Sequence, residues 1–61
     1  MAVKCYLLNR EEKVYRAICR IIDRVPCTIN GKDKEHNRFE FEIHCNPEHI
    51  KEVEKILAPF V

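Results

Sequence analysis

Residues 39–49, FEFEIHCNPEH, decide the predicted fold, because their pattern indicates the end of a strand followed by the start of a helix. From Arg38 to Cys45 the residues alternate between apolar and polar, which is typical of a strand with one buried face. The predicted buried face carries Phe39, Phe41, Ile43 and Cys45, and the other carries Arg38, Glu40, Glu42 and His44. Asn46 and Pro47 then predict a helix start, because proline suits the first helical position. Ile50, Val53, Ile56 and Leu57 give that helix an apolar stripe, which Pro59 should end.

The first half of the chain predicts a strand followed by a helix. Ala2–Leu8 alternates, with Val3, Cys5 and Leu7 on one face and Lys4, Tyr6 and Leu8 on the other. We expect Cys5 on the buried face, and the ring of Tyr6 on the open one. Asn9 is a candidate N-cap, and Pro26 should end the helix near Arg24. The apolar stripe expected for this helix comprises Val14, Ala17, Ile18, Ile21, Ile22 and Val25, with Cys19 beside it.

The middle of the chain predicts a hairpin. Cys27–Asn30 forms a short strand, and Asn30 with Gly31 opens a turn. The polar residues 32–37, KDKEHN, complete a hairpin loop that leads into the strand at Arg38.

The resulting order is β-α-β-β-α in one domain, residues 1–61. Each strand has one apolar face and each helix one apolar stripe, so both helices should cover one side of an antiparallel sheet. Right-handed crossovers insert the third strand between the first two, which gives the order 1-3-2. The predicted class is α+β, a truncated ferredoxin-like fold whose last strand is missing.

The missing strand leaves the first strand at the edge of the sheet. The full ferredoxin-like plan has a fourth strand on that edge, and MAVKCYLL is apolar with a single charge, Lys4. Such an edge pairs readily with another strand. We expect a second copy or a protein partner there, with Lys4, Tyr6 and Leu8 among the contacting residues. A solvated edge protected by Lys4 and by strand twist is the alternative.

Composition narrows the functional classes. The chain is 46% hydrophobic and 34% charged with a net charge of +1, which gives no general attraction to nucleic acid or to anionic membranes. Its apolar runs are shorter than the ~18 residues that cross a bilayer, and its N-terminus lacks the pattern of a signal peptide. We therefore expect a cytoplasmic protein, no membrane association, and cysteines that remain thiols.

His44, Cys45 and His49 are metal-friendly residues close together in sequence, but strand alternation points His44 and Cys45 to opposite faces. Four cysteines without a Cys-x-x-Cys pair favour core packing over a metal or redox site, so we expect no metal and no cofactor. A metal-binding or redox protein is the alternative. No residue combination meets the geometric needs of catalysis, so we expect a protein that is not an enzyme.

A basic ridge follows the predicted first helix, and its members are Lys13, Arg16, Arg20 and Arg24. Such a ridge is typical of a solvated helix face, and it could instead bind an acidic partner surface or phosphates. Nucleic acid is disfavoured, because Glu40 and Glu42 on the open sheet face repel phosphates.

The layout resembles that of ACT regulatory domains, from residues 7–29, LLNREEKVYRAICRIIDRVPCTI, through residues 39–57, FEFEIHCNPEHIKEVEKIL. These domains carry an Asn-Arg-Pro-Gly-Val turn after their first strand. Asn9 and Arg10 match that turn, and Glu11 and Glu12 replace the proline and glycine. The resemblance implies an amino-acid-sensing module whose ligand would contact Asn9, Arg10, Glu11 and Glu12.

The leading functional hypothesis is a small non-enzymatic interaction or regulatory protein. It would act through the edge of the first strand or through the face of the first helix, as a homodimer or bound to a larger enzyme. An inhibitor of the kind that bacteriophages direct at a host enzyme would suit a chain of this length.

Overall fold

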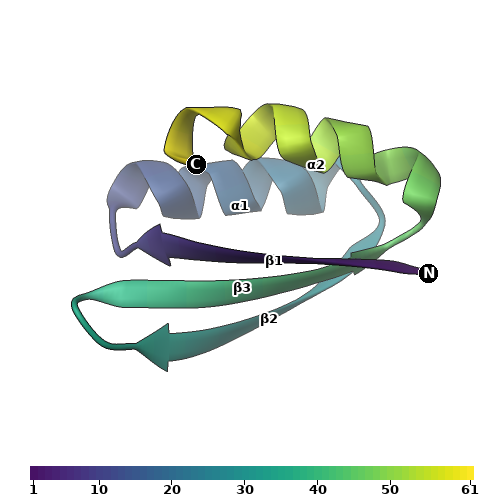
Figure 1. Ribbon diagram of the computed structural model, residues 1–61. Coiled ribbons are helices and arrows are strands. Elements are labelled where there is room, and N and C mark those ends of the chain that lie inside the picture. Colours follow the sequence, from purple (N-terminus) through teal and green to yellow (C-terminus); the bar gives the residue numbers. More distant parts are fainter.

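The predicted α+β fold is confirmed in the computed structural model, which describes all 61 residues. The sheet contains β1 (Ala2–Asn9), β3 (Arg38–Cys45) and β2 (Cys27–Lys34) in that spatial order. β3 is antiparallel to both neighbours. Helices α1 (Glu12–Arg24) and α2 (Ile50–Leu57) lie on one side of the sheet, and its other side is open (Figure 1). No helix is long and apolar enough to cross a membrane.

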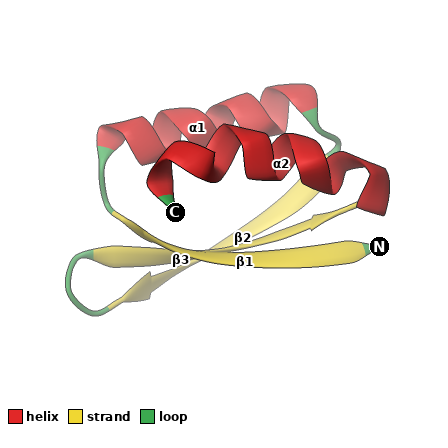
Figure 2. Cartoon of the chain, turned by 45° about the horizontal axis from the view of Figure 1, so that its top comes forward, coloured by secondary structure: helices red, strands yellow, loops and turns green.

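The core lies between the sheet and the two helices. β3 contributes Phe41, Ile43 and Cys45 to it, as the alternation predicts. The other buried residues are Leu8, Val14, Ala17, Ile18, Ile21, Val25, Val53 and Leu57. α2 lies over β1, and α1 lies farther along the sheet, toward β2 (Figure 2). Short 3-10 turns at Pro47–His49 and Ala58–Phe60 extend α2 at both ends, so Pro59 does not end the helical run at once.

The first strand is turned the opposite way to our expectation for Cys5 and Tyr6. In the register with β3, Tyr6 lies opposite Phe41 and Leu8 opposite Phe39, so these residues face the helices. Cys5 is therefore exposed on the open face. Both faces of this strand are apolar in sequence, and the pairing with β3 selects which of them is buried.

The stripe of α1 is narrower than predicted. Cys19 and Ile22 are exposed, Ile22 by 58%. Successive residues of a helix are rotated by 100° about its axis. This rotation places Cys19 and Ile22 beside the buried stripe of Val14, Ile18 and Ile21, on the same side of the helix as Tyr15. The helix also begins at Glu12 rather than after Asn9, because Asn9 still pairs with Arg38 as the last residue of β1.

The second strand is longer than predicted, because pairing with β3 continues to Lys34, which lies opposite Arg38. The turn is only residues 35–37, where His36 and Asn37 adopt positive φ angles of 61° and 57°. Gly31, expected in a turn, lies inside β2 with the ring of Phe39 across it. A methyl group at Gly31 would overlap that ring, so the glycine leaves the space that the Phe39 ring occupies.

Substituting Gly31→Ala should therefore destabilise the protein by about 1–3 kcal/mol, because the new methyl group displaces the Phe39 ring. Urea unfolding measures the change. Asn30→Ala, at an exposed neighbour on the other face, is the control and should cost much less. Equal effects of Gly31→Ala in the native protein and in a Phe39→Ala background would contradict the explanation.

Candidate interaction surface

The open face of the sheet divides into a polar and an apolar part. β3 and β2 place Glu40, Glu42, His44, Thr28, Asn30 and Lys32 on this face. β1 places Val3, Cys5 and Leu7 there, and Val3 and Leu7 are 50% and 49% exposed. Val3, Cys5 and Leu7 form what we call the β1 strip. Sequence reasoning identified these three residues as one face but assigned Cys5 to the core.

The β1 strip borders a free strand edge. β1 pairs only with β3, so its outer side has no neighbouring strand. Met1, 86% exposed, extends the apolar surface at the N-terminal end. An apolar, uncharged side-chain strip beside a free row of backbone donors and acceptors is a surface suited to pairing with another strand.

The inner side of β1 is occupied by α2. Leu8, predicted as an interaction residue, is 3% exposed and belongs to the core. Lys4 Nζ lies 3.9 Å from Glu54 Oε1 on α2, so the one charge of the strand is turned toward the helix. Tyr6 is half-buried, and its hydroxyl is buried without a hydrogen-bond partner. Burial, followed by the nearby Glu54 and Cys45, raises the pKa of the Tyr6 phenol above its ordinary value of 10.0.

The other free edge, β2, is chemically different. Its second half consists of Gly31, Lys32, Asp33 and Lys34, all exposed. Alternating charges on an edge strand oppose pairing with a further strand. The two edges of the sheet therefore differ, and β1 is the apolar one.

The turn from Asn9 to Glu12 has a structural role in the fold. The Arg10 amide donates to the Asn37 carbonyl over 3.0 Å, and the Arg10 guanidinium pairs with Asp33. Its Cζ atom also lies 5.0 Å from the centre of the Phe39 ring. Glu11 caps α1 through its backbone, and the Glu12 carboxylate accepts a 2.6 Å hydrogen bond from Arg16. Arg10 thus fastens the β2–β3 hairpin to the start of α1.

Two of the four residues of the basic ridge on α1 are in ion pairs. Arg16 pairs with Glu12, and Arg24 Nη1 lies 3.6 Å from Glu52 Oε1 on α2. Lys13 and Arg20 are exposed. Because half of the ridge is neutralised within the chain, its attraction for an acidic surface is reduced.

The metal-friendly residues do not converge. Cys45 is fully buried, whereas His44 lies on the open face, as the alternation predicts. The His44 Nε2–H donates to Glu42 Oε1 over 2.5 Å. No group of three or more His, Cys, Asp and Glu side chains is placed to hold a metal ion. Burial, aided by Cys45, raises the pKa of the Cys27 thiol.

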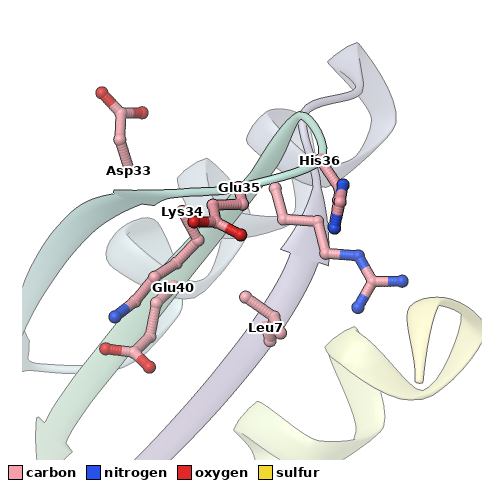
Figure 3. Close-up of a pocket in the computed structure, with 7 residues that line it drawn as sticks. Leu7, Asp33, Lys34, Glu35, His36 and Glu40 are labelled. Atoms are coloured by element: carbon pink, nitrogen blue, oxygen red, sulfur yellow. The ribbon is translucent and has the colours of Figure 1, made fainter.

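An open hollow lies at the hairpin end of the open face (Figure 3). Its lining residues include the basic Lys34, His36 and Arg38, the acidic Glu35 and Glu40, and a single apolar residue, Leu7. Asp33 also borders the hollow, but its side chain points away from it (Figure 3) and pairs with Arg10. Because charges of both signs line it, the hollow favours neither an anion nor a cation. It contains none of residues 9–12.

Comparison with protein-family models, with curated proteins and with solved structures gave no match. The case for function therefore depends on the surfaces described above.

The raised pKa of Tyr6 predicts a loss of stability at high pH. Below pH 10 the phenol is neutral in both states; above it, the unfolded chain loses its proton first, so the free energy of unfolding falls as pH rises. Urea titrations from about pH 9 to 11 should show a steeper decline for the native protein than for Tyr6→Phe. Equal slopes would show that the phenol has the same pKa in both states.

Proposed function

We propose that this protein is a non-enzymatic interaction module that binds a strand of a protein partner along the free edge of β1. The observation that carries the proposal is the contrast between the two sheet edges. β1 combines a free edge with the apolar β1 strip, whereas the β2 edge ends in Lys32, Asp33 and Lys34.

Strand addition explains both parts of this surface. Backbone hydrogen bonds along β1 would supply affinity that depends little on the sequence of the partner. Contacts with Val3 and Leu7 would supply selectivity, because alternate side chains of an added strand meet the same face of the sheet. Lys4, turned toward Glu54, places no charge on the open face.

The other functional hypotheses have less support. On the open face, Cys5 lies opposite the Glu42 carboxylate, whereas nucleophilic cysteines need electropositive surroundings. An amino-acid sensor would use Asn9, Arg10, Glu11 and Glu12, but Arg10 and Glu12 are already in ion pairs. Binding through the basic ridge on α1 is weakened by the pairs of Arg16 and Arg24.

The partner class follows from strand addition. Attached to the sheet of a larger enzyme, a module of 61 residues would act as a regulator or inhibitor of that enzyme. Attached to its own copy, it would be a homodimer. A reducing compartment such as the cytoplasm fits the four free cysteines.

Substituting Val3→Lys and Leu7→Lys together should weaken binding to the partner about thirtyfold. Each side chain is about half exposed, so covering it is worth about 1 kcal/mol, and the two contributions are lost together. The measurement uses the full chain with an affinity tag, first to retain partners from the native host, including untagged copies, and then to titrate the purified partner.

The matched control is Thr28→Lys with Asn30→Lys, two exposed positions on the same face of the opposite edge strand. This variant should bind as the native protein does. Equal affinity of the Val3/Leu7 variant and the native protein would overturn the proposal, as would a loss of binding confined to the β2 variant.

A further inference from the structure

We infer that the strand bound at this edge is β1 of a second copy, antiparallel, with a two-fold axis through Cys5. The inference rests on the proposed function and specifies its partner. It would give a continuous six-stranded sheet in the order β2-β3-β1-β1-β3-β2, with the four helices on one side.

Sheet geometry limits the choice of register. In a continuous antiparallel sheet, residues directly opposite each other point to the same face. Odd-numbered residues of β1 point to the open face, so odd positions must lie opposite odd positions. In a symmetric pair the two-fold axis then lies midway between one residue of β1 and the same residue of the second copy, and we name each register by that residue. The axes that keep most of Ala2–Asn9 paired lie at Cys5 or Tyr6, and axes at Lys4 or Leu7 are the next candidates.

Side-chain complementarity selects Cys5 among these registers. An axis at Lys4 sets two ammonium groups opposite each other, which destabilises a strand pair. An axis at Tyr6 sets Val3 opposite Asn9. An axis at Leu7 sets Cys5 opposite Asn9 and leaves Val3 without a partner in the strand. An axis at Cys5 sets Val3 opposite Leu7 on both sides of a central Cys5 pair, so the two β1 strips merge into one apolar patch.

The inner face supports the same register. The axis at Cys5 sets Lys4 of one copy opposite Tyr6 of the other, and Ala2 opposite Leu8. No like charges then lie opposite each other on this face, because each Lys4 lies opposite a neutral Tyr6.

The size of the core gives a reason for self-association. The single chain buries eleven residues, none of them polar. A domain of about 60 residues buries a smaller share of its surface than a larger domain does. Chains of this size commonly gain stability from an oligomer interface. Pairing two copies covers the β1 edge and extends both the sheet and the layer of helices that covers it.

The register places the two copies of Cys5 opposite each other, so a disulfide between them would identify this register. Opposite residues in an antiparallel pair have Cα atoms about 4.5–5.5 Å apart, within the range of about 4.4–6.8 Å that a disulfide needs. Two Cys5 thiols can therefore lose two protons and two electrons to an added azo oxidant, diamide, and form one S–S bond as the diamide becomes a hydrazine. Cys19, also exposed but on α1, is the internal comparison.

The test combines sedimentation equilibrium of the reduced full chain with diamide oxidation, trypsin digestion and mass spectrometry. Trypsin releases Cys5 in residues 5–10 and Cys19 in residues 17–20, so the two linkages have different masses. We expect a dimer by sedimentation and a Cys5–Cys5 linkage at least tenfold more abundant than any involving Cys19. Cys19→Ser should keep the covalent dimer, and Cys5→Ser should lose it while still sedimenting as a dimer.

Two results would overturn the inference. A dimer without preferential Cys5 linkage would exclude this register. A monomer at millimolar concentration would exclude self-pairing, and binding of a different protein that remains sensitive to Val3→Lys with Leu7→Lys would then leave the proposed function standing. Loss of self-association in the Val3/Leu7 variant, with the Thr28/Asn30 variant unchanged, provides the matched comparison.

Discussion

The pairing of β3 with a strand on each side is the constraint on which the rest of the structure depends. Its eight residues lie opposite residues of both β1 and β2, so one alternating segment fixes the orientation of the whole sheet. Phe41, Ile43 and Cys45 point to the helices and are buried. Once that face is set, Tyr6 and Leu8 must turn inward with them, and Val3, Cys5 and Leu7 must turn outward. The composition of the candidate interaction surface is thus a consequence of the register.

The same constraint produces two unlike edges. β2 begins with apolar residues and continues through Lys32, Asp33 and Lys34, because its pairing with β3 extends that far. Charged side chains are typical of an edge strand that remains exposed to solvent. β1 is apolar on both faces, and only its inner face is covered by helices. Because charged residues protect the β2 edge and none protect the open side of β1, we expect a partner strand to add beside β1.

Much of the fold follows from local patterns. The alternation of residues 38–45, the proline at 47 and the limit at Arg24 predict the elements that the structure contains. The orientation of Cys5 could not be predicted this way, because Val3, Cys5 and Leu7 are as apolar as the opposite face of their strand. Nor could the length of β2, since residues 31–34 have low strand propensity and are held by β3. The sequence predicts that β1 lies at an edge of the sheet. Which of its side chains face outward could be known only from its register with β3.

Amide hydrogen exchange resolved by residue tests the central claim most directly, because it observes the edge backbone itself. In an edge strand, about half of the amides point away from the sheet and exchange quickly unless a further strand covers them. We expect the outward amides of β1 to be protected in the bound or concentrated protein, while those of β2 exchange quickly. Rapid exchange at the β1 edge under conditions of full binding, or protection confined to β2, would contradict the account.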